Sequence, residues 1–324
     1  MLKRFLSYYK PQMGLFVADT ICALVLAAID LAFPIILRNL TGGLFTQGQA
    51  AIMQALGMIA VGLVLMYAAR CACRYFVSYW GHVMGARMES KMREDLFDQY
   101  ERFSFAYFDR NSSGDMMSRV VNDLFDICEA AHHVPEWIII CGIEIIGSFV
   151  ILFTIAPVLA LAMAVVTAVF AVIMFWQNMR MREVFSDNRK KISGINAQLQ
   201  DSLAGMRVVK SYVREDFEKE KFATAARDVQ MDFTRAEKLL AFNNPMMNIC
   251  VNGAFVVIIY LGSKLIITSQ GTLFDVGQLS SIFTYGFAIL MSLMQLSMIF
   301  VMVTMADESA HRITEVLAAE PTRP

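Results

Sequence analysis

Six stretches of this 324-residue chain are long and apolar enough to cross a lipid bilayer. A membrane-spanning helix needs about 20 consecutive, mostly apolar residues. The composition agrees, because 57% of the residues are hydrophobic and only 18% are charged, against about 25% charged in soluble domains. We therefore predict an all-α, multi-pass membrane protein with spans at roughly 13–39, 50–79, 133–155, 158–178, 240–268 and 278–303.

Basic residues are distributed unequally among the segments that join these spans. The joins 80–132 and 179–239 are each longer than 50 residues. The N-terminus, these two long joins and the tail after residue 304 hold 24 of the 28 Lys and Arg residues, and the three short joins hold none. Because basic residues accumulate on the cytoplasmic side of a membrane, both termini and both long joins are predicted to be cytoplasmic. Residues 1–12 are basic and amphipathic, which predicts a short interfacial helix.

The two long joins have the pattern of helices, not of loops. Residues 180–203 and 214–238 carry apolar side chains at spacings of three and four with charged residues between them, and so do residues 86–104. At 1.5 Å per residue, 25 residues of helix extend for about 37 Å. The spans are therefore expected to continue into water, where their extensions pack on each other. In residues 86–104 the apolar positions are Met88, Met92, Leu96, Phe97, Tyr100 and Phe103.

Each long join contains one break in its helical pattern, and we call these breaks the first tip (107–123) and the second tip (201–216). Residues 111–114 favour a turn, and the carboxylate that follows lies near the start of the next helix, where the helix dipole stabilises it. Both tips combine apolar or aromatic residues with charge, a composition typical of small protein–protein contacts. The alternative is a simple helix-hairpin turn.

Several ionisable residues lie inside the apolar spans, where they are costly and usually face the interior of a bundle. Glu144 is near the middle of its span. Methionines recur along the last span, and their adaptable side chains suit surfaces that accept many ligands. These features predict a substrate path that favours cations, with Glu144, Asp30, Met291, Met294 and Met298 as its candidates.

The alternative is that these charges only hold the bundle together. Arg70 and Arg74 are four residues apart and share a face of their helix. In this interpretation either one pairs with Glu136 or Asp19, Asp30 pairs with Arg38, and the methionines are ordinary packing residues.

No pattern for catalysis, for a cofactor or for a metal stands out. Residues 43–48 have glycines at the spacing of a phosphate-binding loop, but Gln49 follows in place of Lys. His132 and His133 are adjacent, and adjacent residues on a helix point about 100° apart, so they cannot easily share a metal. The net charge of −1 argues against a nucleic-acid partner. We predict that the chain alone is not an enzyme and binds no cofactor or metal.

Four segments resemble the transmembrane domain of ATP-binding cassette (ABC) exporters of the type I exporter, or type IV transporter, fold. They are YFDRNSSGDMMSRVVNDLFDI, GINAQLQDSLAGMRVVKSYVREDFEKEKF, GTLFDVGQLSSIF and ADESAHRITEVLAAEP, in the family's order. The resemblance implies that residues 13–318 form this domain and that 319–324 begin a linker. It implies that an absent nucleotide-binding domain would bind ATP and magnesium. It further implies a domain-swapped, twelve-helix homodimer or heterodimer.

The same resemblance assigns roles to the two tips. They would be coupling helices, at about 111–118 and 211–215, that dock on nucleotide-binding domains, with Tyr212 inserted into the partner. The contact residues that the resemblance implies are Asn111, Gly114, Asp115, Ser118, Ser211, Tyr212, Arg214 and Glu215. The expected function is ATP-driven export, by alternating access, of an amphipathic drug, lipid or peptide across a bacterial inner membrane. The alternatives are an importer of the same fold, a secondary transporter, or a membrane scaffold without an ATPase partner.

Overall fold

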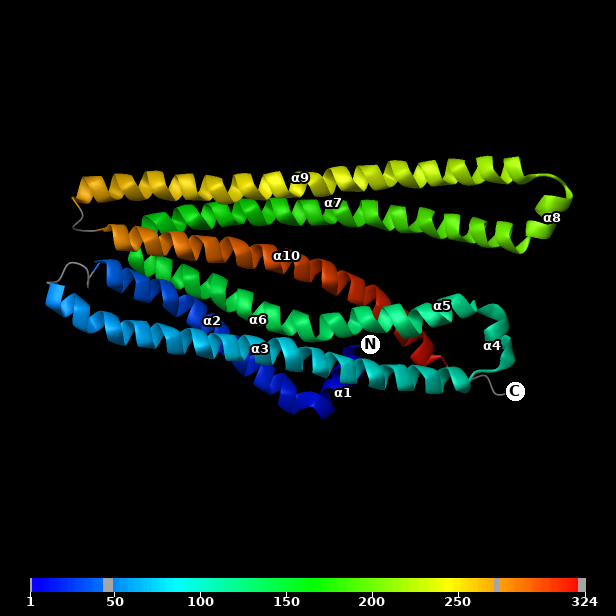
Figure 1. Ribbon diagram of the computed structural model, residues 1–324, viewed down its shortest axis with the longest axis horizontal. Coiled ribbons are helices and arrows are strands. Elements are labelled where there is room, and N and C mark those ends of the chain that lie inside the picture. The colour runs from blue at the N-terminus through cyan, green and yellow to red at the C-terminus, as the bar shows by residue number, and fades with distance from the viewer. Residues whose placement is uncertain (1, 43–48, 271–273, 320–324) are drawn as a thin grey trace. The chain divides into compact units, whose positions relative to one another are not determined.

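The computed structural model describes residues 2–42, 49–270 and 274–319, and across these residues the chain contains helices and no strands (Figure 1). The elements are α1 (Leu2–Tyr9), a 3₁₀ turn (Lys10–Gln12), α2 (Met13–Gly42), α3 (Gln49–Glu101), α4 (Phe105–Arg110), α5 (Ser113–Ser118), a π-helical turn (Arg119–Asp123), α6 (Leu124–Ile155), α7 (Pro157–Ala204), α8 (Met206–Ser211), α9 (Glu215–Ser269) and α10 (Val276–Ala318).

Six helical stretches of the described chain are long and apolar enough to cross a membrane, by length and composition. They fall in α2, α3, α6, α7, α9 and α10, as the sequence predicts. The expected start of a linker at 319–324 lies outside the described residues except for Ala319, and so do residues 43–48.

The predicted helical extensions are confirmed. Residues 180–203 belong to α7, and α9 begins at Glu215 and runs through the second predicted extension. The extension predicted for 86–104 is slightly too long, because α3 ends at Glu101. Ser104 has an extended backbone (ψ 160°) and precedes α4, so the chain turns before the predicted end.

The chain divides into two compact units, residues 1–167 with 255–324, and residues 168–254. In the first unit α2, α3, α6 and α10 pack as a bundle (Figure 1). Two side chains of α10 donate hydrogen bonds to backbone carbonyls of α2. The Tyr285 hydroxyl donates to the Leu31 carbonyl at 2.7 Å, and the Ser281 hydroxyl donates to the Pro34 carbonyl at 3.1 Å. Hydrogen bonds between polar side chains and backbone are favoured in an apolar setting that offers no water.

A hydrophobic cluster holds the extensions of α3, α6 and α10 together. Five of the six apolar positions predicted in 86–104 belong to it, together with Leu124 and Ile127 of α6 and Ile313 and Val316 of α10. The exception is Phe97, which is 57% exposed. It follows buried Leu96 directly, and one residue of helix turns a side chain by about 100°, away from the packed face.

The second unit consists of the adjoining parts of α7 and α9 with α8 between them. Polar contacts join the two long helices at several levels. The Gln177 side-chain amide donates to the Leu239 carbonyl at 3.4 Å, Lys191 pairs with the buried carboxylate of Asp232, and the Ser202 hydroxyl donates to Glu218 at 2.7 Å. These contacts hold α7 and α9 as a paired hairpin that ends in the second tip.

Candidate functional site

A cavity of about 860 Å³ lies within the bundle of the first unit, between α2, α3, α6 and α10. Its walls combine apolar and aromatic side chains with two acidic residues, Asp30 and Glu144, and two basic ones, Arg70 and Arg74. This is the usual composition of a small-molecule pocket, in which apolar surface supplies affinity and a few polar groups fix orientation. Its lining includes Asp30, Arg70, Trp137, Glu144, Phe287 and Met291.

Three of the predicted path residues, Asp30, Glu144 and Met291, line this cavity from three different helices. The other two do not lie among its described lining residues: Met294 is half-buried and Met298 is exposed. The lining on α10 extends only to Gln295. Met298 lies two turns beyond Met291, about 10 Å further along the helix axis, so a shared helix face does not bring it into the same cavity.

The charged residues of the bundle pair between helices. Asp30 of α2 lies 2.8 Å from Arg70 of α3, and Arg74, one turn further along α3, lies 3.9 Å from Glu136 of α6. Asp19 is buried, and its Oδ1 atom has no hydrogen-bond partner among the described residues. Of the pairings weighed from the sequence, the structure thus has Arg74 with Glu136, whereas Arg70 takes Asp30.

Glu144 has a different kind of partner. Its carboxylate accepts a hydrogen bond from the hydroxyl of Ser292, a neutral group on α10. Asp30, by contrast, is compensated by a guanidinium. Glu144 also interacts with Asp30 and Arg70, so these three charged groups form one network. Within it Asp30 holds the direct ion pair, and the hydroxyl of Ser292 donates directly to Glu144.

Sequence reasoning missed the aromatic and hydroxyl residues of this cavity. Trp137 lies seven residues before Glu144, and this spacing places both on one face of α6, which is a usable signal. Phe287 and Ser292 give none, since aromatic and small polar residues are common throughout the spans and only the packing of α10 selects these two.

The first tip is held by local hydrogen bonds and ion pairs. The Asn111 side-chain amide donates to the Tyr107 carbonyl at 2.8 Å, and the Ser112 hydroxyl accepts from the Gly114 backbone N–H at 3.2 Å, at the start of α5. Asp115 lies 3.0 Å from Arg119, and the Asn122 side chain donates to the Ser118 hydroxyl at 3.2 Å. The tip is thereby fixed in shape, with Met117 66% exposed on it.

The base of the first tip is anchored on the hydrophobic cluster. The Tyr107 ring stacks on Phe103 with centroids 4.1 Å apart. Burial raises the pKa of the Tyr107 hydroxyl, so this ring stays neutral well beyond physiological pH. Arg119 also lies 3.7 Å from Glu315 of α10, which connects the tip to the end of that helix.

The second tip contains α8 and, after it, a tight turn. The Ser211 hydroxyl donates to the Val208 carbonyl at 2.9 Å, and the Arg214 backbone N–H donates to the Val209 carbonyl at 3.0 Å, before α9 starts at Glu215. Tyr212 is 74% exposed. Val213 has a φ of 53°, a left-handed conformation that is strained for a β-branched residue.

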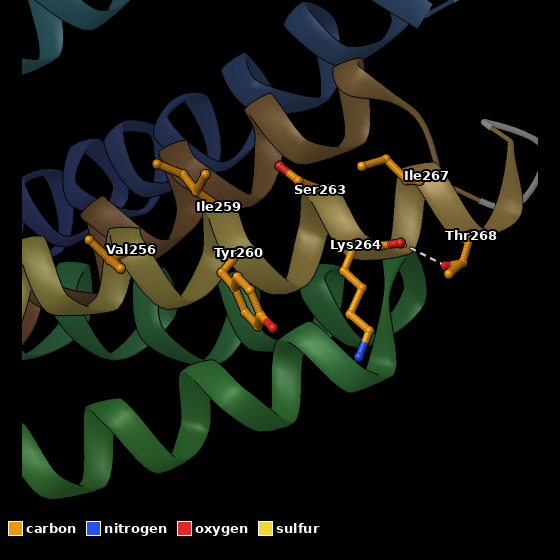
Figure 2. A pocket seen from close by; sticks show the side chains of 7 residues that line it. All are labelled: Val256, Ile259, Tyr260, Ser263, Lys264, Ile267 and Thr268. Atoms are coloured by element: carbon orange, nitrogen blue, oxygen red, sulfur yellow. Dashed lines mark hydrogen bonds between the residues drawn. The ribbon is translucent and has the colours of Figure 1, made fainter.

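A second hollow, of about 510 Å³, runs along the end of α9 in the first unit (Figure 2). Tyr260 and Lys264 lie one turn apart there, and the Thr268 hydroxyl donates to the Lys264 carbonyl at 2.7 Å. All of its seven lining residues belong to one helix, so it is a surface groove. The cavity lined by four helices is the better candidate for a substrate site.

Comparison with known proteins identifies the family. The family model for the ABC transporter transmembrane region matches residues 16–306. The chain belongs to this family. Its bundle is consistent with the ABC exporter transmembrane fold, and the matched region is the membrane part of such transporters and not their catalytic part.

Several bacterial ABC transporters are similar to this chain. The uncharacterized ABC transporter ATP-binding protein YwjA of Bacillus subtilis (strain 168) is 33% identical over 243 residues, which cover 75% of this chain and 42% of the relative. YknU of the same organism, with the same description, is 26% identical over 98% of this chain and 53% of the relative. The ATP-dependent lipid A-core flippase of Syntrophus aciditrophicus (strain SB) is 22% identical over 84% of this chain and 45% of the relative. The chain spans about half the length of the curated relatives it matches.

Proposed function

We propose that this chain is the membrane domain of an ATP-driven exporter that moves an amphipathic substrate through the cavity between α2, α3, α6 and α10. The observation that carries the proposal is the cavity itself. It joins aromatic and apolar side chains to a carboxylate, Glu144, which accepts a hydrogen bond from the neutral hydroxyl of Ser292 and not from an arginine among the described residues. A ligand with an apolar body and a positive charge satisfies both features. The name of the lipid flippase among the relatives supports an amphipathic cargo.

The two tips supply the coupling in this proposal. Each presents an exposed apolar or aromatic residue on a rigid turn at the end of a long helical hairpin. A nucleotide-binding domain that docks on them would move the hairpins as levers when ATP brings two such domains together. Both tips and both termini would then lie on the cytoplasmic side, in agreement with the distribution of Lys and Arg. A second membrane subunit would complete the translocation path.

The test uses the chain together with its nucleotide-binding domain in liposomes, with ATPase activity measured against matched cationic, neutral and anionic amphiphiles. We expect the cationic amphiphile to stimulate most strongly. The Glu144→Gln substitution is expected to raise the half-maximal concentration of the cation about tenfold, which corresponds to about 1.4 kcal/mol. It should leave the response to the neutral amphiphile unchanged.

Glu308→Gln is the matched control, because Glu308 is an exposed carboxylate on α10 outside the cavity. A Glu144→Gln protein that responds to all three amphiphiles as the unmodified protein does would refute the assignment of the cavity. The export function as a whole would be refuted if no amphiphile stimulated the ATPase activity of the assembled protein and the protein transported none of them into inverted vesicles.

A further inference from the structure

Three of the four histidines of the chain gather at one place in the first unit. His82 of α3 and His132, His133 and Glu129 of α6 each offer a ligand atom, and these atoms all lie within 4.8 Å of one another. The ring centroid of His82 lies 4.7 Å from that of His132 and 5.1 Å from that of His133. The cluster lies outside the described lining of the substrate cavity.

Hydrogen bonds fix the tautomers of two of these rings. The Nδ1 atom of His82 lies 2.7 Å from the Ser78 carbonyl, and the Nδ1 atom of His132 lies 2.8 Å from the Cys128 carbonyl. A carbonyl oxygen only accepts hydrogen bonds, so Nδ1 carries the hydrogen in both rings. In the neutral rings, each Nε2 atom therefore keeps its lone pair. A backbone carbonyl that orients the opposite nitrogen is the usual outer partner of a metal-binding histidine.

One of these lone pairs is buried and unused. His132 is 4% exposed, and its Nε2 atom is buried without a hydrogen-bond partner among the described residues. A buried acceptor without a partner is costly. The Nδ1 atom of His133 is also buried without a hydrogen-bond partner among the described residues. It lies 3.9 Å from Glu136, and Nε2 of the same ring lies 3.6 Å from Glu129. His133 thus has a carboxylate on each side, so that one can coordinate a metal with it while the other orients its ring.

The surrounding backbone leaves room for the cluster. A Cβ atom at Gly85 of α3 would lie only 2.8 Å from Nδ1 of His132, so this glycine allows the ring to pack against α3. The buried Asp19 carboxylate lies beside the next glycine on that face: its Oδ1 would be 3.6 Å from a Cβ at Gly81. Asp19, Glu129 and Glu136 thus lie around the imidazoles, and Glu136 is also 3.9 Å from Arg74. The excess of carboxylates over this one guanidinium favours a divalent cation.

We propose that His82, His132, His133 and Glu129 form a binding site for a zinc-type divalent metal ion that joins α3 to α6. Three imidazole nitrogens and one carboxylate oxygen are ligands that zinc accepts, and four protein ligands are typical of a structural site. Zinc–nitrogen bonds of about 2.0 Å place the ligand atoms of a tetrahedral site roughly 3.3 Å apart. Small rotations of the side chains would bring the four atoms to this spacing.

The sequence alone does not indicate this site. Adjacent His132 and His133 diverge around their helix, which argues against shared coordination. In the structure their ring centroids are 4.1 Å apart, and His82, fifty residues away in the sequence, lies against both rings. The third imidazole from another helix makes a common ligand position possible.

The test is a zinc titration of the purified chain in lipid nanodiscs after treatment with a chelator. Isothermal calorimetry is expected to show one zinc ion per chain, and X-ray absorption is expected to show only nitrogen and oxygen neighbours. His82→Gln and His133→Gln remove ligands that are not fully buried, which favours retention of the fold. Loss of a residue that only supports a metal ligand lowers metal affinity by roughly 10- to 100-fold. Each of these substitutions removes a ligand itself and should lower the zinc affinity by more than that.

His311→Gln is the matched control, because His311 is the one remaining histidine and is exposed on α10. It should bind zinc as the unmodified chain does. Zinc should also raise the unfolding temperature of the unmodified chain and of His311→Gln, but not that of His82→Gln. The absence of saturable binding, equal affinity in all variants, or sulfur neighbours in the absorption spectrum would each overturn the proposal. None of these measurements depends on transport or on ATP.

Discussion

Carboxylates that lie among apolar side chains in this protein differ mainly in their partners. Asp30 and Asp123 pair with arginines, whereas Glu144 is bound by the hydroxyl of Ser292. An ionised carboxylate in an apolar setting is costly unless it is paired. The paired carboxylates are therefore expected to hold helices together, and Glu144 is the one expected to respond to a charged ligand.

The pair between Asp30 and Arg70 should stabilise the packing of α2 on α3. Each single substitution, Asp30→Asn or Arg70→Gln, is expected to lower the unfolding temperature. Exchanging the two residues, Asp30→Arg with Arg70→Asp, should recover much of the loss, because the opposite charges still meet. Both side chains are partly exposed, so we expect a coupling energy of roughly 0.5–2 kcal/mol. A double-mutant cycle of thermal unfolding in nanodiscs measures it, and a coupling of zero would contradict the role.

Gly85 should tolerate no larger side chain. A Cβ atom there would lie 2.8 Å from the ring of His132, whose Nδ1–H bond to the Cys128 carbonyl would have to break. Gly85→Ala is expected to destabilise the protein by about 1–3 kcal/mol through overpacking. Gly57→Ala, on the same helix with nothing within 4 Å, is the control and should be neutral or stabilising. Equal unfolding temperatures for the two variants would show that α3 and α6 do not pack this closely.

At the scale of elements, the ends of the long helices are defined by side chains. Asp275 and Gln278 form a capping box at the start of α10: the Asp275 carboxylate accepts from the Gln278 backbone N–H at 2.7 Å, and the Gln278 side chain accepts from the Asp275 N–H at 3.0 Å. This satisfies donors that a helix start leaves free. Near the other end of α10, Arg312 pairs with Asp123 in the π-helical turn before α6, which ties α10 to the first tip.

Removing Arg312 should weaken this end of the bundle. The Asp123 side chain is 1% exposed, and without the Arg312 guanidinium its buried charge would lose its direct ion pair. Arg312→Ala is therefore expected to cost about 3 kcal/mol of stability, near the low end for a broken buried pair because Arg312 itself is half-exposed. The double variant Arg312→Met with Asp123→Asn removes both charges and should be more stable than Arg312→Ala. Chemical unfolding followed by tryptophan fluorescence distinguishes them, and the opposite order would exclude a charge-pairing role.

At the scale of the whole molecule, the sequence predicts what depends on neighbours in the chain. Apolar length and periodicity give the six spans and the helical extensions, because both are properties of a single helix. Partners across helices depend on how the helices rotate and slide, and no local pattern encodes this. Asp30 and Arg38 share a face but lie about 12 Å apart along the axis, too far for direct pairing, whereas Arg70 reaches Asp30 from another helix. His82 likewise meets His132 from another helix, so neither segment alone predicts the histidine cluster.

Tyr212 is the residue at which coupling should be separable from folding. Its ring is 74% exposed on the second tip, so Tyr212→Ala should leave the unfolding temperature unchanged. If the ring inserts into a nucleotide-binding domain, it is an interface hot spot, and its loss should weaken that association by at least 2 kcal/mol, or roughly 30-fold. Pull-down of the separately expressed nucleotide-binding domain and substrate-stimulated ATPase activity should fall together. Phe233→Ala, which removes an exposed aromatic ring from α9 away from the tip, is the control and should change neither. Retention of both readouts in Tyr212→Ala, or equal losses in the two variants, would show that the second tip does not transmit force through this side chain.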